Sequence, residues 1–439
     1  MAVSNLRQKS TRHLANSEQY KQKLLRWSQQ FDEVIWLDSN NNHSSYSSYD
    51  ALLAVDAEKF LKTEVTTAFG ELKDFQSKTQ DWLFGYLTYD LKNAVEELRS
   101  DNFDGLNFPN LYFFQPKKLF LLKGTELQQL YLASYQGELA SDWEAIKNTD
   151  LGNQNLHLND CQDIKIKLRI HKDEYFSKLE KLLGHIYRGD IYEANFCQEF
   201  YSENTSIDPL CSFEKLNAIS AAPFAAYLKL KDLYLMSASP ERFIKKQGPS
   251  IISQPIKGTA KRSKNLEEDR RLKQELSEDP KERSENIMIV DLVRNDLSKT
   301  AKKGTVNVAE LCKVYTFEQV HQMISTVTAE VEADVHPVDI LKSTFPMGSM
   351  TGAPKISAME IIERLEETKR GLYSGAVGYI TPEGDFDFNV VIRSILYSAA
   401  RRYVSYSVGG AITAKSEPLK EYEECLIKAK AMREVLEGL

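Results

Sequence analysis

Strand-like segments cluster near the C-terminal end of this sequence, with only short turns between them. Residues 377–380, 386–396 and 403–408 are rich in β-branched and aromatic side chains, and Gly384-Asp385 and Arg401-Arg402 separate them. Other strand-like runs are grouped in the same way, and helical patterns lie between the groups. This arrangement favours an α+β fold over a strict βαβ alternation.

The N-terminal part has its own group of strand-like runs. The predicted strands are residues 31–37, 82–91, 111–114, 119–122 and 127–134, followed later by a hairpin at 225–236. A polar leader with a short helix is predicted for residues 1–30, and a linker or an edge excursion for residues 140–165. Apolar residues at helical spacing predict helices at 175–187 and 418–436.

Composition excludes several classes of partner. The chain has 439 residues, a formal net charge of −7 and no long basic stripe, so nucleic acid is not expected as a partner. No run of about 18 apolar residues exists, and the polar N-terminus lacks the apolar core of a signal peptide. The five cysteines are odd in number and none lies in a C-x-x-C pair. This pattern is typical of proteins in a reducing compartment. We therefore expect a cytoplasmic protein without a membrane span.

One lysine lies inside a sharp turn. In the segment QPIKGT, Pro255 and Gly258 flank Lys257 and change the direction of the chain. On this segment alone, a solvated loop lysine is the ordinary interpretation. Another role for Lys257 depends on which other groups gather around it.

Two predicted helices carry the same E-x-x-E pattern. The glutamates in this pattern are Glu282, Glu285, Glu421 and Glu424. Pro280 and Pro418 start the helices, and residues three apart share a helix face. Four carboxylates on two faces could hold one hard divalent cation. The alternative is structural, because Glu282 could form a capping box with Asp279 and Glu424 could pair with Lys428 on a solvated face.

Two further side chains have a functional and a structural interpretation. Glu241 follows SASP at a strand end, where a buried carboxyl with a raised pKa could act as a general acid, or an exposed one could simply lie in a turn. His321 lies in the semi-apolar run VHQMISTV, where a hydrogen-bonded core histidine is the ordinary interpretation.

Two glycine-containing segments could present backbone N–H groups to an anion. Residues 348–355 (GSMTGAPK) precede a predicted helix, and Gly409-Gly410-Ala411 follows a predicted strand. The first segment lacks the spacing of a Walker A loop. The predicted core stripe of the helix that follows consists of Ile356, Met359, Ile362 and Leu365. Arg393, in the strand FNVVIRSIL, would bind a carboxylate if it points inward.

The order of these motifs is more specific than any single motif. SPERF, PIKGT, ENIMIVDLVRNDL, GSMTGAPK, VVIRS, GGAI and E-x-x-E follow one another in the chain. In this order they resemble the chorismate-utilising enzymes, which include component I of anthranilate synthase, component I of aminodeoxychorismate synthase, and isochorismate and salicylate synthases. The resemblance is strong over residues 170–437 and fainter in VIWLDS and FGYLTYDL.

The resemblance implies an α+β fold in which two antiparallel-rich β-sheets pack on each other with helices outside. It divides the chain into an N-terminal region that resembles anthranilate synthase component I, residues 1–150, and a chorismate-binding catalytic region, residues 166–439. The family implies that these two regions interleave in one fold.

The resemblance also implies roles for individual residues. Glu285 and Glu424 correspond to direct Mg²⁺ ligands, and Glu282 and Glu421 to ligands that act through water. Glu241 corresponds to the general acid that protonates the departing C4 hydroxyl. The residues expected around the substrate are Arg393, Gly410, Ala411, Lys428, Tyr379, His321 and Ser349. A dianionic substrate in an acidic protein needs such cations to offset the carboxylates.

Lys257 distinguishes members of the family. Anthranilate synthases have alanine at this position, and in those enzymes ammonia attacks C2 of the ring and pyruvate is later lost. Aminodeoxychorismate synthases have PIKGT, and their lysine is thought to attack C2 before ammonia displaces it at C4. We therefore predict 4-amino-4-deoxychorismate, the precursor of p-aminobenzoate and folate, as the product. Mg²⁺ and partial burial are expected to lower the pKa of the lysine.

The chain has no glutaminase motif, so ammonia is expected from a separate glutamine amidotransferase subunit.

Two alternatives to aminodeoxychorismate synthesis stay open at this point. Anthranilate synthesis is the alternative activity, and a non-catalytic module that holds chorismate or tryptophan is a third hypothesis, which the four glutamates and Glu241 disfavour. Leu37, Asp38 and Ser39 resemble the element that binds tryptophan in anthranilate synthases, with core packing as the alternative.

One residue departs from the family pattern. Glu193 lies where many relatives have glutamine and where hydrolytic relatives have a lysine that activates water. A carboxylate at this position disfavours isochorismate or salicylate formation.

Overall fold

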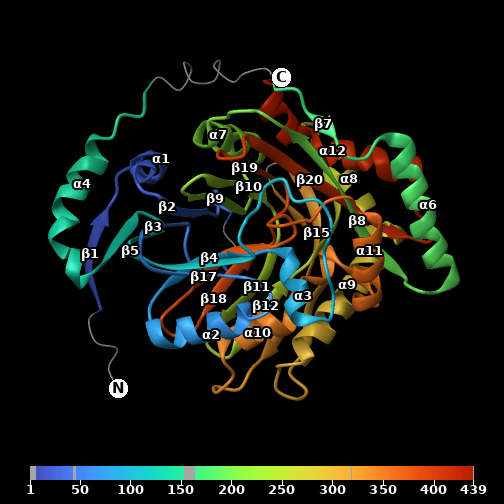
Figure 1. The fold of residues 1–439 in the computed structure, drawn as a ribbon, viewed down its shortest axis with the longest axis horizontal. Helices are drawn as coiled ribbons and strands as arrows, with labels where there is room; N and C mark the ends of the chain where they lie inside the picture. The colour runs from blue at the N-terminus through green and yellow to red at the C-terminus, as the bar shows by residue number, and fades with distance from the viewer. Residues whose placement is uncertain (1–5, 43–45, 153–163, 318, 439) are drawn as a thin grey trace.

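The strands form one hydrogen-bonded network with helices around it (Figure 1). The structure is a computed structural model that describes residues 6–42, 46–152, 164–317 and 319–438. All pairings between its strands are antiparallel. The predicted α+β class is confirmed.

The network divides into two layers that share the long strand β5. In spatial order, the first layer consists of β1 (Arg7–His13), β6 (Glu126–Leu132), β5 (Leu111–Lys123), β3 (Ala51–Thr63), β2 (Glu33–Asp38), β9 (Phe224–Leu230), β10 (Leu233–Ser239), β19 (Ser394–Ser398), β20 (Tyr403–Thr413) and β8 (Glu193–Ser202). The short strands β7 (Lys167–Leu168) and β16 (Gly352–Ala353) pair with the outer edge of β8.

The second layer starts from the other half of β5. It continues through β4 (Leu83–Leu87), β17 (Ala376–Ile380), β18 (Phe386–Asn389), β11 (Arg242–Gln247), β12 (Ser250–Gln254), β15 (Val320–Glu330) and β14 (Asn307–Thr316). β13 (Ile256–Lys261) pairs with β15 next to β12. Residues 111–114 of β5 pair with β4, and residues 118–123 pair with β6, so β5 joins the two layers.

One hydrophobic core lies between the layers, and a second lies between the first layer and the outer helices. Ile35 of β2 shares the first core with Phe84 and Ile244 of the second layer, whereas its neighbours Val34 and Trp36 belong to the second core. Successive strand residues point to opposite faces, so both faces of the first layer are buried. The predicted packing of two layers with helices outside agrees with this arrangement, although β5 connects the layers.

The helices cover the outer faces of the layers (Figure 1). They are α1 (Ser17–Trp27), α2 (Ala68–Thr79), α3 (Lys92–Val95), α4 (Leu139–Asn148), α6 (Lys172–Arg188), α7 (Pro209–Ser220), α8 (Leu266–Glu278), α9 (Pro280–Ser298), α10 (Pro337–Thr344), α11 (Lys355–Leu365) and α12 (Pro418–Glu437), with 3-10 turns η1 (Ser28–Gln30), η2 (Tyr89–Leu91), η3 (Ala133–Glu138) and η4 (Gly348–Met350). None of the described helices combines the length and apolarity that a membrane crossing requires.

Both predicted starts of the glutamate-bearing helices are confirmed. The Asp279 carboxylate caps α9 and accepts hydrogen bonds from the backbone N–H groups of Lys281 and Glu282, at 2.8 and 2.9 Å. Pro418 lies in the first turn of α12, where its missing N–H costs nothing. These starts determine which faces of α9 and α12 carry the E-x-x-E pairs.

Two N-terminal predictions are wrong. Part of the predicted polar leader is the strand β1, which pairs with β6 and buries an ion pair between Arg7 and Asp81. Its side chains are polar on both faces, so no apolar alternation indicates a strand. Helix α4 occupies part of the predicted linker and buries Trp143 and Ile146. Residues 153–163 of that linker lie outside the described residues.

Two further predictions from apolar patterns, a pair of strands and a helix core stripe, are partly wrong. Residues 111–114 and 119–122 belong to one strand, β5, which continues through Pro116. Pro116 lies opposite Ala57, beside a register irregularity of β3, where the ladder tolerates the missing N–H. Ile356 of the predicted core stripe is 47% exposed, whereas the other three residues of that stripe are buried.

The two sequence regions contribute to the same sheets. Strand β2 of the N-terminal region pairs with β9, and β4 pairs with β17. Each region therefore supplies neighbours to the strands of the other.

A buried ion pair joins β8 to the turn η4. The Glu366 carboxylate accepts hydrogen bonds from Arg370 at 2.7 and 2.9 Å and from the Cys197 N–H at 2.8 Å. The Arg370 guanidinium also donates to the carbonyl oxygens of Asn195 (2.7 Å) and Met350 (2.6 Å). This network holds two segments that carry side chains of the candidate site.

Replacing Glu366 by leucine (Glu366→Leu) should lower the free energy of unfolding by about 3–5 kcal/mol, because the Arg370 charge stays buried without its carboxylate. Urea unfolding measures the change. The double variant Glu366→Leu/Arg370→Met removes both charges and should lose less stability than the single variant. If Glu366→Leu were as stable as the parent, the Glu366–Arg370 pair would not stabilise the link between β8 and η4.

Candidate active site

Lys257 lies in a cluster of carboxylates near the start of β13. Its ammonium donates a hydrogen bond to Oε1 of Glu193 at 3.1 Å, and the two side chains are 11% and 1% exposed. The next residue, Gly258, has φ +85, and a Cβ there would lie 3.0 Å from Oε2 of Glu282. Glycine therefore allows both the bulge in β13 and the close approach of α9. The solvated-loop interpretation of Lys257 is wrong.

The surrounding carboxylates keep Lys257 charged. Burial by itself lowers the pKa of this amine, but the charges of Glu193, Glu285 and Glu241 outweigh burial and raise the pKa above its ordinary value. The expected effect of Mg²⁺ on this pKa stays a prediction, and burial does lower the pKa as expected. A nucleophilic role requires a group that removes the proton.

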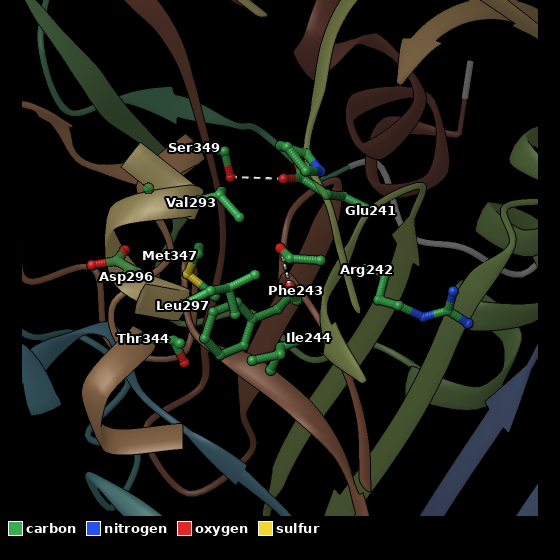
Figure 2. Close-up of a pocket in the computed structure, with 13 residues that line it drawn as sticks. Glu241, Arg242, Phe243, Ile244, Val293, Asp296, Leu297, Thr344, Met347 and Ser349 are labelled. Carbon is green, nitrogen blue, oxygen red and sulfur yellow. Dashed lines mark hydrogen bonds between the residues drawn. The ribbon is translucent and has the colours of Figure 1, made fainter. Parts of the chain in front are cut away.

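Glu241 is a buried carboxyl in the turn between β10 and β11. Ser349 Oγ of η4 donates a hydrogen bond to Glu241 Oε1 at 2.7 Å, as Figure 2 shows. Burial raises the pKa of Glu241 to about 7, against the opposing effects of the Ser349 hydrogen bond and the Lys257 charge. The exposed-turn interpretation of Glu241 is therefore wrong, and the carboxyl can hold a proton near neutral pH.

Apolar side chains border Glu241 on one side. A cavity of about 20 Å³ next to this carboxyl is walled mainly by Phe243, Ile244, Val293, Leu297 and Met347 (Figure 2). These side chains offer no hydrogen bond to a carboxylate, which is consistent with the raised pKa. Arg242 points away from this cavity (Figure 2) and pairs with Asp387 at 2.9 Å.

One residue that the sequence reasoning missed holds Ser349 in place. Asn195 of β8 donates a side-chain hydrogen bond to the carbonyl of Ser349 at 2.8 Å, and its backbone N–H donates to the carbonyl of Thr351 at 2.7 Å. Asn195 lies two residues after Glu193 in β8, so one strand positions both groups. The only signal in the sequence is a polar residue in an otherwise strand-like run.

The two E-x-x-E faces lie against each other. Lys281 Nζ is 3.3 Å from Glu421 Oε1 of α12 and 3.8 Å from Glu285 Oε1 of its own helix. A Cβ on Gly410 of β20 would lie 3.2 Å from Glu421 Oε2 and 4.0 Å from Glu424 Oε1. The four glutamates therefore border one region between α9, α12 and β20.

These glutamates fit a hydrated divalent cation. Glu285 Oε1 is buried without a hydrogen-bond partner, and burial raises the pKa of Glu285 to about 7 despite Lys257 and Lys281. Among the described residues, no three histidine, cysteine or acidic side chains form a tight metal cage. Mg²⁺ needs few protein oxygens and keeps several waters, so a looser set of glutamates suits it. Glu424 also pairs with Lys428 at 2.6 Å, as the structural alternative predicted.

Four predicted substrate ligands lie near the same region. Lys428 donates to the Gly409 carbonyl at 2.9 Å, and Gly410 and Ala411 follow in β20. Arg393 is half-buried, and its guanidinium forms no hydrogen bond or ion pair with the described residues. The predicted strand 386–396 breaks before Arg393, which has φ +52 and precedes β19. Burial lowers the pKa of Arg393, and this effect outweighs the opposing charges of Tyr373 and Glu424.

His321 and Tyr379 have further neighbours outside this cluster. The ring nitrogens of His321 lie 3.0 Å from Thr316 Oγ1 and 3.0 Å from Asp269 Oδ1, as expected for a hydrogen-bonded core histidine. Tyr379 lines a different cavity, together with Leu37, Asp38 and Ser39. Their positions beside the substrate stay a prediction.

The cavity beside Leu37, Asp38 and Ser39 has a volume of about 70 Å³. Asp38 is buried and accepts a hydrogen bond from Lys21 at 3.0 Å, and Ser39 Oγ has no hydrogen-bond partner within the described ranges. A cavity of about 150 Å³ is large enough for benzene, so this one must expand to admit an indole. Tryptophan binding here stays a prediction.

The pKa of Glu241 predicts a pH-dependent stability. A raised folded-state pKa means that the stabilising contribution is present below the unfolded pKa of about 4.5 and is lost as the pH rises through about 7. The amide in Glu241→Gln does not ionise, so this variant keeps its stability as the pH rises. Relative to the parent, the variant should gain about 3 kcal/mol between about pH 4 and about pH 8. Urea unfolding at each pH measures the difference, and parallel pH profiles would contradict the prediction.

Comparison with known proteins agrees with the fold and shows the family. The family model described as "chorismate binding enzyme" matches residues 14–434. An "Anthranilate synthase component I-like protein" of Synechocystis sp. is 37% identical over 82% of this chain and 73% of its own. An "Aminodeoxychorismate synthase component 1" of Klebsiella aerogenes is 39% identical over 62% of this chain, and this match spans 60% of the Klebsiella protein. The corresponding Bacillus subtilis protein is 31% identical over 86% of this chain and 81% of its own.

A solved structure shares the fold. The crystal structure of anthranilate synthase component I from Streptococcus pneumoniae TIGR4 superposes with a TM-score of 0.77 and 24% identity, covering 89% of this chain and 94% of that one. The match of the family model over almost the whole chain and the 37% identity to a relative carry the assignment. The chain belongs to the family of chorismate-binding enzymes.

Proposed function

We propose that the protein aminates chorismate to 4-amino-4-deoxychorismate, with Lys257 as the nucleophile. The observation that carries this proposal is the amine of Lys257, buried against Glu193 and within the field of Glu241 and Glu285. A lysine at this position distinguishes the aminodeoxychorismate synthases from the alanine-bearing anthranilate synthases. Relatives named aminodeoxychorismate synthase component 1 support the proposal.

The proposed reaction has two displacements. The neutral amine of Lys257 attacks C2 of chorismate, the ring double bonds shift, and the C4 hydroxyl leaves as water with a proton from Glu241. Ammonia then bonds to C4 while the bond between C2 and the lysine breaks, and the proton that the new amine releases restores Glu241. One ammonia enters, one water leaves, and the enolpyruvyl group stays on the product.

Chorismate is a dianion, so the site must supply positive charge. The unpaired guanidinium of Arg393 and the amine of Lys428 provide it on one side, with the backbone at Gly410 and Ala411 beside them. Glu285 and Glu424 would hold Mg²⁺ directly, and Glu282 and Glu421 would hold it through water. The ion would neutralise the ring carboxylate against this acidic wall.

Ammonia would come from a separate glutaminase subunit. A relative named "component 1" implies a second component, and the chain itself shows no glutaminase motif. The product would supply p-aminobenzoate and folate synthesis.

Anthranilate synthesis is the second candidate. Relatives named anthranilate synthase component 1 or component I-like protein match this chain at 33% and 37% identity. In this alternative, ammonia attacks C2 directly and Lys257 has no covalent role.

The products separate the two candidates. We expect the protein, given chorismate, Mg²⁺ and ammonium at alkaline pH, to form a compound that an aminodeoxychorismate lyase converts to p-aminobenzoate. Lys257→Ala should lower this activity by about 10²-fold or more, because the covalent step is lost. Fluorescent anthranilate as the main product would refute the proposal. Formation of aminodeoxychorismate by Lys257→Ala at the parent rate would refute the role of Lys257.

If Mg²⁺ binds between the four glutamates, Lys281 should lower the affinity for the ion. This ammonium lies between Glu285 and Glu421, so its positive charge opposes a cation bound there. Lys281→Met should therefore bind Mg²⁺ about 5- to 10-fold more tightly in titration calorimetry without substrate. The control is Lys420→Met, because Lys420 is an exposed lysine of α12 that pairs with Glu417. Equal or weaker Mg²⁺ binding by Lys281→Met would contradict the placement of the ion.

A further inference from the structure

The proposed function leaves Glu193 without a role. Its Oε1 accepts the hydrogen bond from Lys257 at 3.1 Å, whereas its buried Oε2 has no hydrogen-bond partner among the described residues. A carboxylate offers about four lone-pair sites, so a single hydrogen bond leaves the charge of Glu193 poorly stabilised.

The backbone holds Glu193 in place. Glu193 pairs with Thr413 of β20 on one side and with Ala353 of β16 on the other. A Cβ on Gly352 would lie 2.1 Å from the Glu193 carbonyl oxygen, so β16 lies directly against this residue. The carboxylate therefore stays within hydrogen-bond reach of the Lys257 amine.

Other charged groups act on Lys257 at longer range. They are Glu241 in the β10–β11 turn, Glu282 and Glu285 on α9, and Glu424 on α12. Among the described residues, only Glu193 accepts a hydrogen bond from the Lys257 ammonium. Glu241 already accepts a hydrogen bond from Ser349, and in the proposed reaction it donates its proton to the leaving C4 hydroxyl.

We infer that Glu193 is the base that removes the proton from the Lys257 ammonium before attack on the substrate. The inference rests on the proposed function. The N–H bond of Lys257 breaks, an O–H bond forms on Glu193, and two buried charges disappear together, which removes the cost of desolvating both. When ammonia displaces the lysine from C2, the released amine recovers the proton from Glu193, so the pair ends the cycle unchanged.

The variant Glu193→Gln tests this role because its amide keeps the shape and the acceptor oxygen but takes up no proton. Rapid quenching and mass spectrometry would follow adduct formation on Lys257 from chorismate and Mg²⁺ without ammonia. We expect the rate to fall by about 10²-fold or more near pH 7 and to recover as the pH rises, because hydroxide then deprotonates the lysine. Chorismate binding, measured by calorimetry, should not weaken, because the variant removes a negative charge from the site of a dianion.

The opposite result has a clear meaning. If the charge of Glu193 only holds the proton on Lys257, Glu193→Gln will form the adduct at an equal or higher rate at pH 7, and the inference fails. Glu193→Asp keeps a base on a shorter side chain and should recover part of the rate. The same low rate and pH profile in both variants would attribute the loss to packing and overturn the inference. A parent protein that forms no adduct would instead overturn the proposed function itself.

Discussion

The buried pair of Lys257 and Glu193 is the interaction on which the site depends. Without Glu193, one ammonium would face Glu241 and Glu285 with no direct partner, and without Lys257 three carboxylates would repel one another in a region of low solvent access. The site is thus a wall of negatively charged carboxylates that surrounds the single amine of Lys257. Such a wall attracts a divalent cation, and a cation makes the wall suitable for a dianionic substrate.

The fold brings these groups together from distant parts of the sequence. Glu193 starts β8, Lys257 lies within the bulge of β13, and Glu241 lies in a turn between β10 and β11. The Arg370–Glu366 pair connects β8 to the turn that carries Ser349. Rigid strands and a buried joint therefore set the distances between the reacting groups, which is what a multi-step displacement requires.

The sequence predicted those parts of the site that depend on local patterns. The caps of α9 and α12 depend on Asp279 and on prolines, and such signals lie within one turn of the residues that they organise. The order of the motifs was sufficient to identify the family. The buried carboxyl of Glu241 was one of two local interpretations, and only tertiary packing decided between them.

The features that the sequence did not reveal depend on partners far away in the sequence. His321 and Asp269 lie on different elements, so nothing near His321 indicates which groups its ring bonds to. Tyr379 faces the cavity of Leu37 because β17 pairs with β4, a pairing between opposite ends of the chain. The raised pKa of Lys257 likewise results from carboxylates on β8 and α9, and burial alone predicts the wrong direction.

The central claim is that Lys257 becomes covalently attached to the substrate. Mass spectrometry of the protein after incubation with chorismate and Mg²⁺, without ammonia, tests this claim most directly. The account predicts an added mass equal to chorismate less one water, located on the peptide that contains Lys257 and lost when ammonia is supplied. Conversion of chorismate to the aminated product by a protein whose mass never changes, even on rapid quenching, would contradict it.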